Sequence, residues 1–146
     1  MPQPWLLVDL DLAWTHARFK DAETDDITVG RYVPNSVDRV YTGTVTLKDL
    51  GPWTLSLTER YIGAGALTAD NSVRASSSLV SNLRVSRRLG KSSTLTLDLL
   101  NLFDRRYNDI EYYYATQLAG ETAPVNDKVL HPGEPRSARL TLRVEF

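Results

Sequence analysis

The sequence contains no cysteine, which excludes disulfide bonds, thiolate metal sites and a cysteine nucleophile. It also lacks any apolar run near the roughly 18 to 20 residues that a membrane-spanning helix requires, so a helical membrane protein is excluded. Its 146 residues carry a net charge of −1, and no excess of one sign points to an anionic partner. We therefore expect no nucleic-acid partner.

Patterns that carry catalysis or bind metals are also missing. The two histidines, His16 and His131, have no companion ligand at metal spacing. Asp9 and Asp11 share a face but have no third ligand, so we interpret them as solvated acids with Arg84 or Arg143 as candidate partners. No Gly-x-Ser-x-Gly element is present. The sequence predicts neither an enzyme nor a cofactor site.

What the sequence does contain is strict alternation, most clearly in residues 136–146. Apolar side chains there occupy every second position: Ala138, Leu140, Leu142, Val144 and Phe146. Polar side chains occupy the positions between them: Ser137, Arg139, Thr141, Arg143 and Glu145. Since the side-chain period of a β-strand is two, this segment is one strand with an apolar face and a charged face.

Six such alternating segments can be counted, at about residues 5–19, 37–48, 53–62, 76–89, 94–103 and 136–146. Short turns at 49–52 and 90–92 alternate with long connections at about 20–36, 63–75 and 104–135. Short turns at one end and long loops at the other are typical of outer-membrane barrels. The predicted fold is all-β, an antiparallel up-and-down meander of about six strands that forms a curved, open segment of a transmembrane β-barrel.

Aromatic residues support a membrane barrel. Trp53 and Tyr61 share a face eight residues apart, which at about 3.3 Å per residue and a tilt near 45° separates them by about 19 Å along the membrane normal. They are candidates for two aromatic girdles. Glu59 lies on the same face and is a fault in the pattern. The alternative is a small soluble β-sheet ligand-binding protein, whose apolar face would cover a core.

Six strands are fewer than the eight of the smallest bacterial barrels, and open strand edges are not tolerated in lipid. The chain is therefore part of a longer barrel, a protomer of an assembled barrel, or not a membrane protein. Its N-terminal residues lack the basic region, apolar stretch and cleavage site of a secretory signal. A fragment of a longer protein is the simplest interpretation.

Several motifs resemble the C-terminal end of TonB-dependent outer-membrane receptors. In chain order they are Arg60-Tyr-Ile-Gly63, Leu67-Thr-Ala-Asp-Asn-Ser72, Asn101-Leu-Phe-Asp-Arg-Arg-Tyr-Asn108, Tyr112-Tyr-Tyr114, His131-Pro-Gly-Glu-Pro-Arg136 and the terminal Phe146. The resemblance covers most of the chain from about Val33 onward and, more weakly, the first strand. Residues 1–146 are thus expected to form the C-terminal part of such a barrel, without the plug domain and the earlier strands.

The resemblance implies a 22-stranded barrel in the outer membrane of a Gram-negative bacterium, which takes up scarce ligands such as ferric siderophores or cobalamin. Implied partners are outer-membrane lipid, the remaining barrel and plug, the barrel-assembly machinery, and TonB through the plug alone. Leu140, Leu142, Val144 and Phe146 match the family's assembly signal. Tyr112, Tyr113 and Tyr114 are candidate extracellular ligand contacts, although a loop that packs on itself or lies at the membrane interface is the favoured interpretation.

Overall fold

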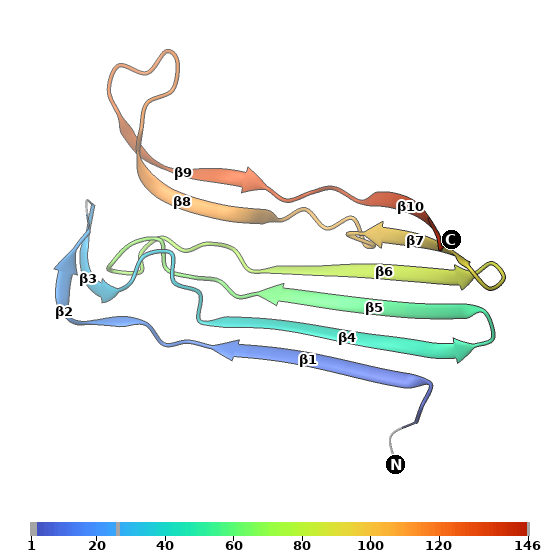
Figure 1. The fold of residues 1–146 in the computed structure, drawn as a ribbon. Coiled ribbons are helices and arrows are strands. Elements are labelled where there is room, and N and C mark those ends of the chain that lie inside the picture. The colour runs from blue at the N-terminus through green and yellow to red at the C-terminus, as the bar shows by residue number, and fades with distance from the viewer. Residues whose placement is uncertain (1–2, 26, 146) are drawn as a thin grey trace.

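The computed structural model describes residues 3–25 and 27–145, which form ten β-strands (Figure 1). The strands are β1 Leu6–Trp14, β2 Arg18–Thr24, β3 Val29–Tyr32, β4 Arg39–Leu50, β5 Trp53–Ile62, β6 Ser78–Arg88, β7 Ser93–Leu100, β8 Asn108–Thr116, β9 Val125–Pro132 and β10 Ser137–Val144. Within these described ranges no helix has the length and apolar character needed to cross a membrane.

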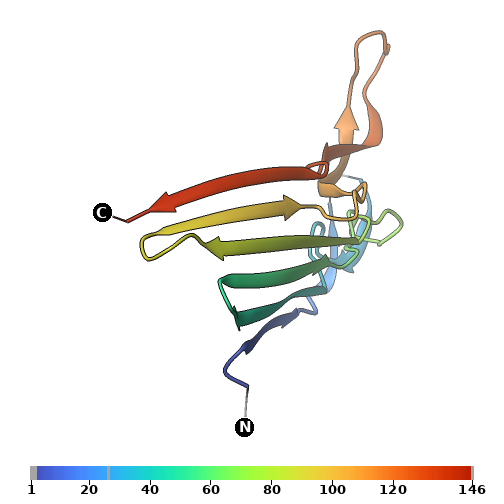
Figure 2. The same cartoon turned by 90° about the vertical axis from the view of Figure 1, so that its right-hand side faces the viewer.

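Six of the strands form one antiparallel sheet in the order β1-β4-β5-β6-β7-β10. The hairpins β2–β3 and β8–β9 are separate two-stranded sheets that extend from one end of it (Figure 1). We call this the loop end, and the end with the turns at 51–52 and 89–92 the turn end. Figure 2 shows that the sheet is curved and open, with β1 and β10 as its edges. The predicted fold is confirmed.

The register places apolar side chains in rows across the sheet. One row contains Val8, Val45, Leu57, Leu83, Leu99 and Ala138. The adjacent row on the opposite face contains Leu7, Thr46, Ser56, Arg84, Asp98 and Arg139. Because side chains alternate between the faces, the sheet has an apolar face and a polar face along its whole width.

Nothing in the described residues covers the apolar face. Leu12 is 72% exposed and Leu140 is 68% exposed, at opposite edges of the sheet. The buried apolar residues are few and lie at the loop end: Ala66, Leu67, Ala69 and Val80. A soluble sandwich would bury the apolar face against a second sheet, and the described chain provides no such layer.

The polar face is connected across the strands by side-chain hydrogen bonds. Hydroxyl pairs join β4 to β5 and β6 to β7: Thr44 to Thr58 at 3.0 Å, Thr46 to Ser56 at 2.9 Å, and Ser86 to Thr96 at 3.0 Å. The Arg84 guanidinium donates to the Asp98 carboxylate at 2.6 Å. The prediction that Arg84 or Arg143 pairs with Asp9 and Asp11 is wrong, because Arg84 pairs with Asp98 and Arg143 with Glu145.

Two segments expected to be loops contain strands. Residues 20–36 include most of β2 and all of β3, and the first strand ends at Trp14 rather than near residue 19. Residues 104–135 include β8 and β9, which pair from Thr116 with Val125 to Asn108 with Pro132. Three consecutive tyrosines interrupt the period of two in β8, so alternation alone does not reveal this hairpin.

Asn101 holds the base of the β8–β9 hairpin together. It is 2% exposed and has a φ of 48°, a conformation that Asn tolerates better than most residues. Its side-chain amide donates to the carbonyls of Arg105 and Glu134, at 2.9 and 3.1 Å, and accepts from the Arg105 N–H at 2.9 Å. The two chain segments that enter and leave the hairpin are therefore joined through one side chain.

Replacing Asn101 with glycine tests this role, because glycine keeps the positive φ but removes three hydrogen bonds. We expect Asn101→Gly to lower the free energy of unfolding in detergent by about 2 to 4 kcal/mol. Asn35→Gly is the matched control: Asn35 has a φ of 63° and an exposed side chain, so its loss should cost less than about 0.5 kcal/mol. Equal effects in urea titrations would contradict the proposed role of the side chain.

Candidate ligand groove at the loop end

The loop between β5 and β6 is the anchor of the loop end. Residues 66–69 are buried, and both Thr68 and Ala69 are close to 0% exposed. The backbone N–H of Tyr32 donates to the Ala69 carbonyl at 3.0 Å, so β3 lies directly against this loop. A Cβ at Gly30 would lie 1.9 Å from the same carbonyl oxygen, which explains glycine at this position.

The Asp25 carboxylate ties the β2–β3 hairpin to this loop. It accepts from the backbone N–H groups of Ile27 at 2.8 Å, Thr28 at 2.5 Å and Ala69 at 2.6 Å. Burial raises the pKa of Asp25, but these N–H groups and the Thr28 hydroxyl lower it more, so the pKa lies below its ordinary value. Asp25 is therefore charged at neutral pH and stabilises the docked hairpin.

A second carboxylate, that of Asp70, orders the loop itself. One of its oxygens accepts from the Ser72 N–H at 3.0 Å, the Ser72 hydroxyl at 2.8 Å and the Thr68 hydroxyl at 2.8 Å. The Ser72 N–H and hydroxyl, followed by the Thr68 hydroxyl, lower the pKa of Asp70 to about 2. The loop thus satisfies its polar groups internally and presents a fixed surface to its neighbours.

A groove separates this loop surface from strand β8. It comprises two cavities of about 270 and 440 Å³, which share Asn35 and Leu67 in their walls. Tyr112 and Glu111 line the smaller cavity, and Tyr113 and Tyr114 line the larger one together with Asp25. The groove has a mixed apolar and polar lining, as small-molecule sites usually do.

Glu111 fixes β8 along one wall of the groove. Its side chain is 3% exposed, and its carboxylate accepts from the Asn108 amide at 2.8 Å and the Lys128 ammonium at 3.0 Å. Burial raises the pKa of Glu111, but the hydrogen bonds from Asn108, Lys128 and the Ser76 backbone lower it more. The pKa of Glu111 therefore lies below its ordinary value. The buried carboxylate is therefore charged and paired.

Among the residues selected from the sequence, the three tyrosines come together on the groove wall. The two residues predicted to form aromatic girdles lie at opposite ends of the apolar face: the Arg87 guanidinium lies over the Trp53 ring, and Tyr61 stacks on Tyr41 with ring centroids 4.9 Å apart. Leu140, Leu142 and Val144 lie exposed on β10 far from the groove, and Phe146 lies outside the described residues.

The sequence analysis did not identify Asp25 or Glu111. Their partners are distant in the chain: Asp25 binds a backbone N–H 44 residues away, and Glu111 pairs with Lys128 17 residues away. Neither residue belongs to a recognisable motif. In the part of the chain that the structure describes, no group of three or more His, Asp or Glu side chains is arranged to hold a metal ion.

The fold is similar to that of solved import receptors. No protein-family profile matches the sequence, and no curated protein sequence matches it. Two crystal structures of the ferric-catecholate import receptor Fiu from Escherichia coli K12 match the chain. The closed form has a TM-score of 0.73 and 20% sequence identity, and the open form has a TM-score of 0.58 and 17% sequence identity. Each match covers 99% of this chain and 19% of the receptor, so the chain spans about a fifth of the receptor's length. The resemblance to a TonB-dependent receptor barrel is confirmed at the level of the fold.

Acidification should release the β2–β3 hairpin from the loop. Because the pKa of Asp25 is lower in the folded state than in the unfolded state, its contribution to stability is complete above the unfolded value of about 3.8. The contribution of Asp25 to stability is lost as the pH falls through the pKa that Asp25 has in the folded state. Hydrogen-exchange protection factors of the Tyr32 and Ala69 amides should therefore fall between pH 4 and pH 2.

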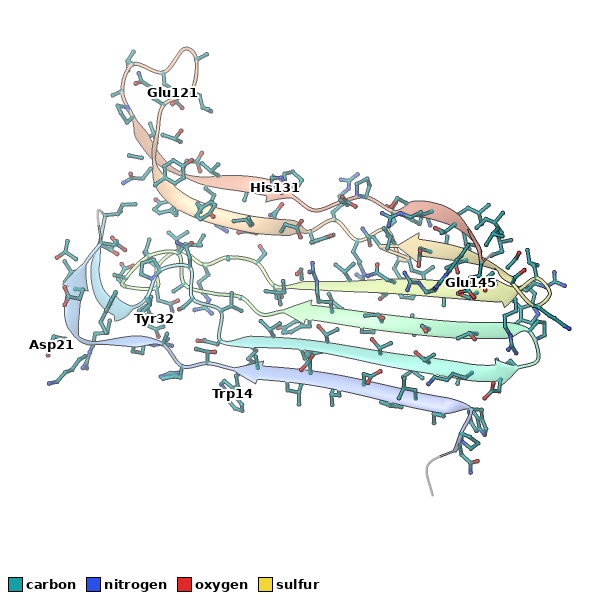
Figure 3. All side chains as sticks on the ribbon, viewed as in Figure 1. Trp14, Asp21, Tyr32, Glu121, His131 and Glu145 are labelled. Carbon is teal, nitrogen blue, oxygen red and sulfur yellow. The ribbon has the colours of Figure 1, made fainter. Side chains whose placement is uncertain are left out.

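Asp25→Asn should lower the same protection factors at neutral pH and remove most of their pH dependence. Asp21→Asn is the control, because Asp21 lies exposed on β2 and projects away from the loop (Figure 3). If Asp21→Asn and Asp25→Asn reduced protection equally, the carboxylate of Asp25 would not be the group that holds the hairpin.

Proposed function

We propose that this chain is a section of an outer-membrane receptor barrel that takes up a scarce ligand. In this proposal it belongs to the TonB-dependent receptors and lies in the outer membrane of a Gram-negative bacterium. The observation that carries the proposal is the apolar face, which extends across six paired strands and is not covered by a second layer in the described residues. A surface of this size requires an apolar environment, and a bilayer supplies it.

The polar face supports the same assignment. Its hydroxyl pairs and the Arg84–Asp98 ion pair satisfy one another across the strands, as in the water-filled interior of a barrel. In a soluble sheet the same face would meet water and the apolar face would be covered. Since the apolar face is the uncovered one, the polar face is assigned to the lumen.

The edge strands define the partners of this section. β1 and β10 each pair on one side only within the described residues, and unpaired backbone groups are not tolerated in lipid. We assign both edges to further barrel strands, and β10 with Phe146 to recognition by the assembly machinery. Energy from TonB would reach the ligand through a plug domain rather than through this chain, which alone would not transport.

The groove at the loop end supports a receptor role. It lies at the end that would carry the extracellular loops of an outer-membrane barrel, and three consecutive tyrosines of β8 contribute to the lining of its two cavities. The solved receptor to which the fold is similar imports a ferric catecholate. We assign the groove to contacts with a ferric siderophore, whose aromatic groups would stack on tyrosine rings. No catalytic role is assigned.

A charge placed in the middle of the apolar face tests the membrane assignment. Leu57 lies four residues from both Trp53 and Tyr61, at the centre of the face. Leu57→Arg should lower the free energy of unfolding from vesicles by about 2 to 4 kcal/mol, whereas Thr58→Arg on the polar face should lower it much less. The measurement is urea-dependent folding into phospholipid vesicles.

Detergent partition of the unaltered chain provides the second arm of this test. The chain should enter the detergent phase and aggregate in buffer alone. A chain that is monomeric, soluble and cooperatively folded without detergent would instead establish the small soluble β-sheet protein.

The groove assignment is tested with a ferric catechol complex and the chain folded in detergent. Tyr113→Ala should weaken its binding about tenfold or more, because a stacked aromatic contact is worth about 1 kcal/mol beyond the buried area of the ring. Leu118→Ala near the hairpin tip is the control and should leave binding unchanged. Binding is followed by quenching of tryptophan fluorescence, and equal affinities of both variants would remove the tyrosine wall from the site.

A further inference from the structure

Two arginine–tryptophan pairs occupy opposite ends of the apolar face. Arg39 lies over the Trp14 ring at 5.5 Å, and Arg87 lies over the Trp53 ring at 5.1 Å. In each pair the two residues are direct partners across neighbouring antiparallel strands. Trp14 is 80% exposed and projects outward from the loop end of β1 (Figure 3). The same arrangement thus occurs once at each end of the face.

The register gives the separation of the two pairs. The Gly63 N–H donates to the Arg39 carbonyl at 2.8 Å, which places Gly63 at the level of the Arg39–Trp14 pair. Gly63 lies ten residues beyond Trp53 along β5. At about 3.3 Å per residue and a tilt near 45°, the two levels are about 23 Å apart along the barrel axis, close to the apolar band of about 25 Å of an outer-membrane barrel.

Both guanidinium groups retain their hydrogen-bond donors. Arg39 and Arg87 are exposed, and neither forms an ion pair with any acid in residues 3–25 or 27–145. A cation–π contact at these distances uses none of the guanidinium N–H donors, so the donors stay available. Two parallel N–H groups match the oxygens of a phosphate group.

From these pairs we infer that Arg39 and Arg87 bind the phosphate groups of lipid headgroups, one in each leaflet. The inference rests on the proposed membrane function and adds a specific lipid contact to it. The tryptophan of each pair would lie at the level where headgroups meet acyl chains, and its arginine would reach the phosphate. The two pairs then fix the depth of the sheet in the bilayer.

The rest of the apolar face is consistent with contact with lipid. Between the two levels Glu59 is the one charged side chain on the face of the described strands. It accepts from the Ser81 hydroxyl at 2.7 Å, and its partner on β4 is Gly43, which leaves room for the carboxyl group. A carboxyl group at this depth is costly in lipid, and the hydrogen bond from Ser81 reduces that cost.

Tryptophan depth measurements test the inference. The chain contains Trp5, Trp14 and Trp53, so replacing two of them with phenylalanine gives variants that report on Trp14 or Trp53 alone. Together with the barrel strands that would flank β1 and β10, these variants are folded into vesicles of phosphatidylcholine or phosphatidylglycerol that carry bromine at a shallow or a deep acyl position. Both tryptophans should be quenched more strongly by shallow bromine.

The arginines are tested by the preference for anionic vesicles. Arg39→Gln and Arg87→Gln should each reduce the preference for phosphatidylglycerol about fivefold, and Arg39→Lys should retain only part of it, because lysine keeps the charge but lacks the two parallel N–H groups. Arg88→Gln is the control, since Arg88 neighbours Arg87 but lies on the polar face and donates to the Gly51 carbonyl at 3.2 Å. The preference of the Arg88→Gln variant for phosphatidylglycerol should be unchanged.

Outcomes that would contradict the headgroup contacts can be distinguished from an outcome that would contradict the membrane function. Strong quenching by deep bromine, or equal effects of Arg87→Gln and Arg88→Gln, would overturn the headgroup contacts while leaving the chain in the membrane. The absence of quenching by any brominated lipid would overturn the membrane function itself, and the inference with it.

Discussion

The register of the six-stranded sheet is the constraint on which the rest of the structure depends. Apart from an irregularity between Leu47 and Leu50 of β4, the strands pair residue by residue, so a shift of one position in any pair would move its apolar side chains to the polar face. The hydroxyl pairs between Thr44 and Thr58 and between Ser86 and Thr96 would then be lost as well. One backbone alignment therefore sets the apolar surface, the polar surface and the levels of the aromatic residues together.

The fold follows from local sequence more readily than the site does. Alternation is a local signal, and β5 lies at the residues where the pattern places it, from Trp53 to Ile62. The β8–β9 hairpin has no such signal, since three tyrosines in succession put aromatic rings on both faces. The motif that begins at Asn101 was recognised from the sequence, but its role depends on Glu134, which only the folded chain brings near.

The contacts that organise the loop end are long-range and polar, which explains why sequence reasoning missed them. A carboxylate such as that of Asp25 can accept from any nearby N–H, so the residue type does not name its partner. The same limit produced the wrong partner for Arg84: several acids share the polar face, and only the register selects Asp98. Trp53 was identified from the sequence, whereas its partner Arg87 lies 34 residues away.

The hydrogen bonds that hold the loop end together do not use the hydroxyl groups of the three tyrosines that line its groove. Asp25 and Asp70 bind mainly backbone N–H and hydroxyl groups, and Glu111 binds Asn108 and Lys128. None of these hydrogen bonds involves the hydroxyl of Tyr112, Tyr113 or Tyr114. Structural and exposed functional groups are thus separate, and a rigid wall can present aromatic rings at little cost in conformational entropy on binding. Because of this separation, the exposed rings could be substituted without loss of the hydrogen bonds that keep the loops folded.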